Sequence, residues 1–400
     1  MTTQTADHTH IRATNLAAVL GHLRREAPCS RAAIATGTGL NKATVTSIVG
    51  DLLDRRLVRE TQQTQNHVGR PATLLVLEGS AYATIGLEVS ARGLTVLSCD
   101  TAGDQVLRWH RAGPGIDAGP ARTIAAVAAL TRRAIAAVQA SGRQVLGITA
   151  GVPGLVNRDG AVILAAALGW RDVPMRAELV AALGRPDIPV TVDNDATLGA
   201  LAEHLYGPLA GTANLIRLTG DTGVGAGIIA DGKPLAGHLG YVGEIGHLRL
   251  VPDGPRCGCG RRGCLEALAG LPAILASYQA RTGGPADSDP QVQLEELIRH
   301  ADAQDTAATQ TLAEAGTHLG NGVAALVNLL NPEVVLLGGA YALLADHLTP
   351  AIDKALREAT VAPDAGGCTV AASTLPDTAT PLGATAQAFT PLTQGQLPAR

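Results

Sequence analysis

The chain has 400 residues, of which 46% are hydrophobic and 16% charged, and its formal net charge is -4 at pH 7. This apolar content excludes intrinsic disorder for most of the chain. Single hydrophobic cores stop growing at roughly 250 to 300 residues, so we expect two or three domains. No apolar run approaches the roughly 18 to 20 residues that a spanning helix needs, and the N-terminal segment does not resemble a signal peptide. We therefore expect a cytoplasmic protein with no membrane partner.

The charge is distributed unevenly along the chain. Residues 1–80 carry nine Lys or Arg against six Asp or Glu, whereas the remainder carries 22 against 29. A basic N-terminal part favours a separate module that contacts a polyanion, although an offset of this size also arises by chance.

Three short helices are predicted in the N-terminal part. Apolar residues recur at helical spacing over Arg12–Arg25, and Pro28 follows the end of that run. Ser30 is a suitable N-cap for a second helix, and Asn41 for a third. Strands are predicted over residues 57–60 and 73–77. Three helices and a two-stranded wing predict a winged helix-turn-helix domain over residues 11–78.

A winged helix-turn-helix suggests which side chains contact DNA. Four polar residues share the exposed face at the start of the third helix, namely Lys42, Thr44, Thr46 and Ser47. We expect them to contact base edges or phosphates in the major groove of a pseudo-palindromic operator. Arg70, in the wing, is expected to enter a narrow A/T-rich minor groove. Arg31, Arg55 and Arg56 are either phosphate contacts or solvated surface charges.

Beyond residue 80 the pattern is that of an α/β fold. A helix is predicted over 121–140, and strands over 82–88, 94–99, 145–149, 190–192, 215–218 and 334–337. Most of these strands end in polar or glycine-rich loops, so ligand chemistry is expected outside their carboxyl ends. Residues 391–400 are expected to form a flexible tail.

A cysteine cluster is the strongest chemical signal in the chain. Cys257, Cys259 and Cys264 lie within eight residues, and His247 precedes the first of them by ten. Three thiolates and one imidazole are typical of a closed, tetrahedral zinc site, so structural Zn²⁺ over the loop 247–266 is favoured over free thiols or a redox pair. A fully ligated zinc ion has no open position for a catalytic water.

Carboxylates flank this cluster and recur after an earlier strand. Glu244 and Glu266 could hold hydroxyl groups of a small polar ligand, although Glu266 could equally be a helix-starting carboxylate. Asp195 could accept a proton from a substrate hydroxyl or cap a helix. The glycine-rich turn 220–227 could bind phosphate or simply connect two hairpin strands.

These motifs, taken in order, resemble the ROK family of repressors, open reading frames and sugar kinases. The resemblance rests on the winged helix, Gly69-Arg70-Pro71, Gly151-Val152-Pro153-Gly154, Asp193-Asn194-Asp195, Glu244-Ile245-Gly246-His247 and CGCGRRGCLE. It is closest to the xylose- and N-acetylglucosamine-type regulator branch. It implies a two-lobed, actin-like ATPase fold (sugar kinase-like) over residues 80–390, with a monosaccharide between the lobes and a homodimer or homotetramer as the assembly. The implied sugar contacts are Gly154, Asn194, Asp195, Glu244, His247 and Glu266.

Two departures from the family pattern bear on function. Ala167 stands where members often have an Asn that contacts the sugar, so that contact is absent and the resemblance leaves the effector open. The kinases carry Asp-x-Gly-Gly-Thr after their first strand, but this chain has Glu88-Val89-Ser90-Ala91-Arg92. The second phosphate loop is only partly retained, because it contains Asp221. We therefore expect weak or absent ATP binding and a regulator with no catalytic residue.

Two alternatives remain beside a sugar-responsive DNA-binding regulator. One is an ATP-dependent sugar kinase with an appended DNA-binding domain, in which Asp195 is the catalytic base. The other is a DNA-binding protein whose kinase-like body is only a dimerisation scaffold. Xylose, glucose and N-acetylglucosamine all remain candidate effectors, and the direction of the sugar effect on DNA binding is open.

Overall fold

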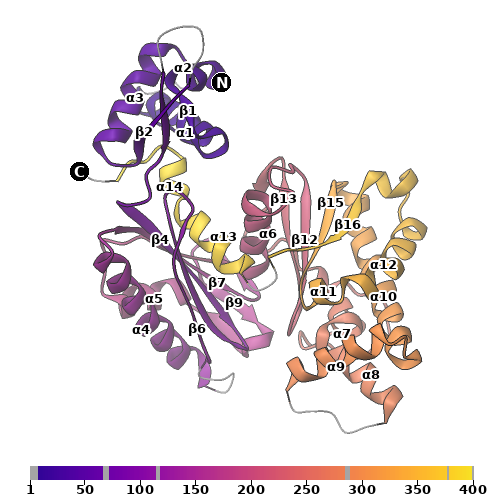
Figure 1. The fold of residues 1–400 in the computed structure, drawn as a ribbon. Coiled ribbons are helices and arrows are strands. Elements are labelled where there is room, and N and C mark those ends of the chain that lie inside the picture. Colours follow the sequence, from indigo (N-terminus) through magenta and orange to yellow (C-terminus); the bar gives the residue numbers. More distant parts are fainter. Residues whose placement is uncertain (1–7, 66–71, 114–117, 284–288, 376–377, 399–400) are drawn as a thin grey trace, which may run out of the picture.

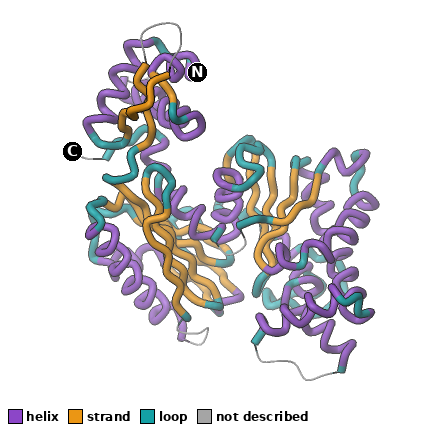
Figure 2. Tube along the Cα trace, in the orientation of Figure 1, coloured by secondary structure: helices purple, strands orange, loops and turns teal. Residues whose placement is uncertain are grey.

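The computed structural model describes residues 8–65, 72–113, 118–283, 289–375 and 378–398 (Figure 1). Within these residues the chain forms an N-terminal head and two lobes. Figure 2 shows one large sheet in each lobe, with helices packed against it. Each of these sheets has five strands, and the head has a sheet of three.

The head has the predicted winged helix-turn-helix elements. They are α1 (His8–Glu26), β1 (Cys29–Ser30), α2 (Arg31–Thr38), α3 (Lys42–Asp54), β2 (Val58–Gln65) and β3 (Ala72–Leu77). Ser30 caps α2 by accepting a hydrogen bond from the Ala33 amide, and Asn41 caps α3 through the Thr44 amide, as predicted. The antiparallel order β1–β3–β2 adds a short third strand to the predicted pair. Arg70, which was predicted to lie in the wing, falls outside the described residues.

Lobe one contains the first large sheet, in the order β11–β7–β4–β5–β6. Its strands are β4 (Tyr82–Ser90), β5 (Gly93–Asp100), β6 (Gln105–Arg111), β7 (Gln144–Val152) and β11 (Val190–Asn194). A smaller sheet holds β8 (Leu155–Val156), β9 (Val162–Ala165) and β10 (Trp170–Val173). Helices α4 (Gly119–Ala140) and α5 (Met175–Leu183) pack on the large sheet and complete one core.

Lobe two contains the second large sheet, in the order β14–β13–β12–β15–β16. Its strands are β12 (Leu215–Gly220), β13 (Val224–Ala230), β14 (Lys233–Pro234), β15 (Val334–Gly339) and β16 (Thr369–Ala372). One face packs on a helical layer made of α7 (Leu265–Ala269), α8 (Leu271–Thr282), α9 (Pro290–Asp302), α10 (Thr306–Leu330), α11 (Ala340–Leu343) and α12 (Ala345–Ala359). The strands predicted in both lobes are all present, most of them longer than predicted.

Two helices lie between the sheets and join the lobes. Helix α6 (Asp195–Tyr206) packs on β12 and β13 of lobe two, and α13 (Ala379–Ala388) packs on β4 and β7 of lobe one. The two helices also pack against each other, as Figure 1 shows. A change in the spacing of the lobes must therefore move one of these helices or their contact.

The expectation of a flexible tail over residues 391–400 is wrong for residues 391–398. Helix α14 (Thr390–Thr393) follows α13, and Phe389 and Leu392 are buried in the core of the head. The Arg55 guanidinium also donates to the Pro398 carbonyl. The tail is ordered because its apolar residues cover the head, which the composition of the last ten residues did not indicate.

One helix in the described residues is long and apolar enough to cross a membrane. It is α4, with 22 residues, and half of its most apolar 18-residue window is buried. Its buried side chains include Ile124, Val127, Ala134 and Ile135, which belong to the core of lobe one. Burial of this kind is typical of a core helix.

Candidate functional site

The four predicted metal ligands come together in lobe two. The ligand atoms of His247, Cys257, Cys259 and Cys264 all lie within 4.8 Å of one another. Cys259 Sγ and Cys264 Sγ are 3.8 Å apart, and Cys257 Sγ is 3.7 Å from His247 Nδ1. Zn–S bonds of about 2.3 Å and a Zn–N bond of about 2.0 Å in a tetrahedron give edges of roughly 3.8 and 3.6 Å. The donor set and its spacing therefore fit a tetrahedral metal ion, and these four residues form a possible metal-binding cluster.

The same distances bear on the alternative of a redox pair. A disulfide has an S–S length of about 2.05 Å, far shorter than the 3.8 Å between Cys259 and Cys264, and all three cysteines are outside any disulfide. The loop needs Gly263, whose φ is +69° and where a Cβ would lie 1.5 Å from the Val251 carbonyl oxygen. The local backbone is thus folded tightly enough to direct three sulfurs to one point.

Six residues predicted to contact sugar lie around this cluster and at the start of α6. We call this set the interlobe site, and it consists of Gly154, Asn194, Asp195, Glu244, His247 and Glu266. Asn194 ends β11 and caps α6 through the Thr197 amide at 2.9 Å, while its Nδ2 donates to the Gly154 carbonyl at 3.0 Å. Gly154 has φ +92°, and a Cβ there would meet the Leu164 carbonyl oxygen at 2.2 Å.

Asp195 is not the N-cap of α6 that sequence reasoning left open. Asn194 is the cap, and Asp195 is the first helical residue. Its carboxylate accepts from the Ala196 amide at 2.8 Å, and its carbonyl accepts from Thr380 Oγ1 of α13. Burial raises the pKa of Asp195 to about 6 against the lowering effect of the Ala196 amide, and the nearby Asp221 carboxylate also raises it.

The metal cluster and the acidic residues are in direct contact. Glu266, on α7, accepts from Cys257 Sγ at 3.3 Å and from the Val224 amide at 3.1 Å. Glu244 Oε2 lies 3.9 Å from His247 Nε2, on the opposite side of the imidazole from the thiols. Burial, followed by repulsion from Asp195 and Glu266, raises the pKa of Glu244 to about 7. The Glu266 carboxylate therefore does more than start a helix: it ties the glycine-rich β12–β13 turn to the metal cluster.

The predicted DNA-facing residues lie at the exposed start of α3. Lys42, Thr46 and Ser47 are exposed, whereas Thr44 is half-buried. The opposite face is buried through Val45, Ile48, Val49 and Leu52, as expected. The Thr46 hydroxyl donates to the Lys42 carbonyl at 2.8 Å.

The three arginines of unassigned role each have a partner within the chain. Arg31 pairs with Glu60 at 3.0 Å and Arg56 donates to Ser80 Oγ at 2.9 Å. Arg55, as described above, donates to the C-terminal segment. Arg55 and Arg56 therefore each connect the head to another segment of the chain.

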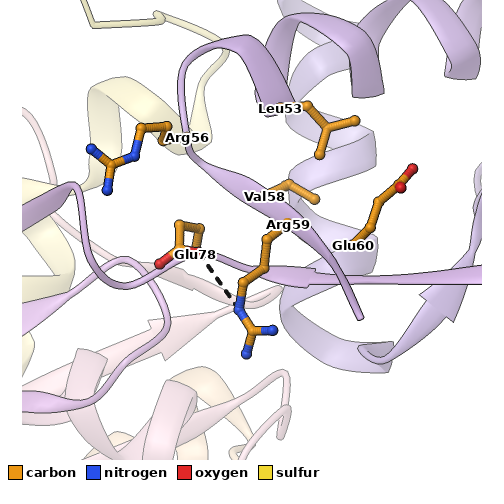
Figure 3. Close-up of a pocket in the computed structure, with 6 residues that line it drawn as sticks. All are labelled: Leu53, Arg56, Val58, Arg59, Glu60 and Glu78. Carbon is orange, nitrogen blue, oxygen red and sulfur yellow. Dashed lines mark ion pairs between the residues drawn. The ribbon is translucent and has the colours of Figure 1, made fainter. Parts of the chain in front are cut away.

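A shallow pocket lies where the head joins lobe one (Figure 3). It is lined by Leu53, Arg56, Val58, Arg59, Glu60 and Glu78. Arg59 Nε lies 3.6 Å from Glu78 Oε2 across it. The pocket contains no residue of the interlobe site, and its ion pair joins β2 to the linker that follows β3.

Sequence reasoning missed a buried ion pair next to the interlobe site. Arg217, on β12, is 3% exposed, and its Nε lies 3.6 Å from Oε1 of Glu203, on α6. Ser373 Oγ also donates to Glu203. Burial lowers the pKa of Arg217, and the carboxylates of Glu203, Asp221, Asp195 and Glu88 raise it. The available signal was a single charged residue within β12.

A winged helix-turn-helix head, a two-lobed body and a thiol–imidazole cluster beside a polar site define a DNA-binding protein with a sugar kinase-like body. Comparison with known proteins gives the family. Residues 85–390 match the ROK family, so the chain belongs to it. The head, from α1 to β3, lies outside the matched range.

Three relatives show how regulators and kinases of this family compare with the chain. The chain is 29% identical to the xylose repressor of Bacillus subtilis over 332 residues, or 83% of each chain. Its structure is similar to that of a ROK family transcriptional regulator described as a homolog of the E. coli MLC protein, with a TM-score of 0.81, 27% identity, and coverage of 97% of this chain and 98% of that one. A ROK glucokinase from Streptomyces griseus matches 77% of this chain and 99% of its own, with a TM-score of 0.66 and 25% identity. The regulator thus matches almost the whole chain, whereas the kinase matches about three quarters of it.

Proposed function

We propose that this protein is a sugar-responsive transcriptional repressor of carbohydrate metabolism genes. Its head binds an operator in double-stranded DNA, and a monosaccharide bound at the interlobe site changes the affinity of the head for that operator. The observation that carries the proposal is the direct contact between the metal cluster and the acidic residues of the interlobe site, in a chain that also has a recognition helix. The similarity to a xylose repressor and to an MLC-type regulator supports it.

The metal we propose for the cluster is a structural zinc ion. Three thiolates and His247 Nδ1 complete its coordination, so it supplies no catalytic water. The ion would anchor the imidazole so that Nε2 is directed toward Glu244, and would bind the Cys257 sulfur as a thiolate, so that Glu266 keeps the Val224 amide as its donor. Zinc therefore positions two carboxylates and one N–H group that suit the hydroxyls of a sugar.

The DNA contacts we propose are Lys42, Thr44, Thr46 and Ser47 on α3, with Arg70 in the wing. Binding to a pseudo-palindromic operator requires two heads at a defined spacing, so the active form is at least a homodimer. The sugar acts by favouring one arrangement of the lobes over another, because a ligand shifts an equilibrium only through different affinities for the two states.

The alternative function is an ATP-dependent sugar kinase. The pKa of Asp195, near 6, suits a proton acceptor at neutral pH. Against it stand the side chains of Ser90, Ala91 and Arg92 in the β4–β5 turn, and the ion pair of Arg92 with Asp221 at 2.9 Å. A kinase needs bare turns there for the phosphates, so we propose that the body binds sugar without phosphorylating it.

Fluorescence anisotropy tests these alternatives. The zinc-replete protein is titrated onto DNA from the region upstream of its own gene at fixed salt, with and without xylose, glucose or N-acetylglucosamine. A repressor binds this DNA specifically, and one sugar shifts the affinity in the wild type but not in Asp195→Asn. Sugar-dependent ATP consumption that Asp195→Asn abolishes, with DNA binding only at the nonspecific level, would establish the kinase instead.

A further inference from the structure

Two equivalent turns, one from each lobe, meet beside the interlobe site. The β4–β5 turn of lobe one carries Arg92, and the β12–β13 turn of lobe two carries Asp221. Arg92 donates to Asp221 Oδ1 at 2.9 Å, although 129 residues separate the two in sequence. Both side chains retain solvent contact, with 59% and 38% of their surface exposed. An ion pair therefore joins the ends of two hairpins that belong to different lobes.

Carboxyl groups from both lobes lie behind this pair. Asp221 interacts electrostatically with Asp195 and with Glu88, and Glu88 lies near the end of β4. Burial and the repulsion from Asp195 and Asp221 raise the pKa of Glu88 to about 7, while Arg92 and Arg217 lower it. Three carboxylates from two lobes thus converge, and two arginines compensate them.

The two arginines differ in the contacts that they make. Arg217 is buried and pairs with Glu203 on the lobe-two side, through two elements that pack together directly. Arg92 is exposed and pairs across the boundary between the lobes. Removal of Arg217 would disturb packing, whereas removal of Arg92 removes the attraction between the two turns and a favourable charge near Glu88.

We propose that the Arg92–Asp221 ion pair is a latch that holds the two lobes together around the interlobe site in the absence of any nucleotide. Arg92 is then a positioning residue for sugar binding, which it affects through the spacing of the lobes and without touching the sugar. The latch itself does not depend on the proposed function; only its effect on sugar affinity rests on that function.

The latch should be sensitive to salt because it is exposed. Pairs of this kind change an equilibrium by roughly two- to fivefold, and salt screens them. A variant that adds a fourth carboxylate at the turn should have a larger effect, because it replaces attraction with repulsion. A lysine at position 92 keeps the charge and should preserve most of the latch, although it loses the planar geometry of the guanidinium.

Hydrogen–deuterium exchange of the full-length protein without sugar tests the latch directly. The variants are Arg92→Lys, Arg92→Ala, Arg92→Glu, Asp221→Lys and the charge-swapped double variant Arg92→Glu/Asp221→Lys, with Arg108→Ala on β6 as a control for loss of an exposed arginine in lobe one. We expect the amides of both turns to exchange faster than in the wild type. Exchange should be fastest in Arg92→Glu, slower in Arg92→Ala and slowest of the three in Arg92→Lys. We expect the double variant to recover protection relative to both of its single variants, and Arg108→Ala to match the wild type.

Calorimetric titration with xylose, glucose and N-acetylglucosamine gives the effect on the interlobe site. For whichever sugar binds the wild type, Arg92→Ala should weaken binding by about two- to fivefold in 50 mM NaCl and by less in 500 mM NaCl. Equal exchange in the wild type and Arg92→Glu, or a double variant no better than its single variants, would overturn the latch. If none of the sugars binds the wild type while the exchange differences persist, the latch stands and the proposed sugar response is wrong.

Discussion

The Arg24 guanidinium, in α1 of the head, donates a hydrogen bond to the Tyr206 hydroxyl at 2.8 Å. The Arg24 Cζ atom lies 5.7 Å from the centre of the Tyr206 ring. Tyr206 is the last residue of α6, and Asp195 is the first. A helix of 12 residues, about 18 Å long, therefore runs from the interlobe site to the DNA-binding head. A shift of α6 along its axis would act on the head through this contact.

The first prediction concerns this contact. Tyr206→Phe removes the hydroxyl but keeps the ring below Arg24, so the hydrogen bond is lost while the packing remains. We expect the sugar-induced change in operator affinity to fall by about fivefold, equivalent to roughly 1 kcal/mol of coupling, with sugar affinity within twofold of the wild type. Anisotropy with and without sugar measures the coupling, and Tyr278→Phe, in α8, is the control. An unchanged sugar effect in Tyr206→Phe would show that α6 does not act through Arg24.

The second prediction concerns the metal cluster. Cys259→Ser removes one of four ligands, so we expect bound zinc to fall from about one ion per chain to a small fraction of that value. Glu244 and Glu266 then lose their anchored neighbours, and sugar affinity should drop by about tenfold or more. Elemental analysis of dialysed protein and calorimetry measure the two effects. Cys368→Ser, which lies outside the cluster, should retain both properties; a zinc content of one in Cys259→Ser would contradict the assigned ligands.

The third prediction concerns the buried pair of Arg217 and Glu203. Removal of one partner leaves an uncompensated buried charge, so Arg217→Met and Glu203→Leu should each lower the free energy of unfolding by about 3 to 5 kcal/mol. The double variant removes both charges and should recover most of that loss. Urea denaturation of the four proteins gives the double-mutant cycle, and additive losses would mean that the two side chains are not coupled.

The fourth prediction concerns DNA binding by Lys42. The chain has only three lysines, at positions 42, 233 and 354, and only Lys42 lies in the head. If the Lys42 ammonium neutralises one phosphate, Lys42→Ala should reduce the slope of log affinity against log salt by about 0.9. Lys354→Ala, in α12 of lobe two, makes the same chemical change away from the head and should leave the slope as it is. Equal slopes in Lys42→Ala and the wild type would remove Lys42 from the interface.

The fifth prediction concerns the pH dependence of stability. The pKa of Glu88 is raised to about 7 in the folded protein from an ordinary value of 4.5, chiefly by burial. Its contribution to stability is therefore fully present below pH 4.5 and is lost as the pH rises through 7. Relative to Glu88→Gln, the wild type should lose up to about 3 kcal/mol of unfolding free energy between pH 5 and 8. Denaturation curves of both proteins at several pH values measure this difference, and parallel pH profiles would contradict the raised pKa.

Much of this architecture could be read from local sequence signals. Ser30 and Asn41 were identifiable as helix caps because a cap depends on a side chain and an amide three residues away. The possible metal-binding cluster was equally recognisable, because three thiols within eight residues and a histidine ten residues before them have few other uses in one loop. Helix caps and clustered ligands depend on residues that are close together in the chain, so the sequence alone is enough to predict them.

The C-terminal segment shows why other features could not be read in this way. In the sequence, the apolar residues Phe389, Leu392 and Leu397 are scattered along a largely polar chain end. Only the fold reveals that they cover the core of the head. Composition cannot indicate a partner surface that lies more than 300 residues earlier in the chain.

By itself the sequence determined the winged head, the alternating strands and helices, the four residues of the possible metal-binding cluster and the order of the polar loops. Only the tertiary structure decided that Arg92 meets Asp221, that Arg217 is buried with Glu203, and that α6 connects Asp195 to Arg24 through Tyr206. The physical reason is that an ion pair or a hydrogen bond between distant residues depends on how two lobes and a head are placed in space. That placement results from the packing of whole sheets and helices, which no single segment specifies.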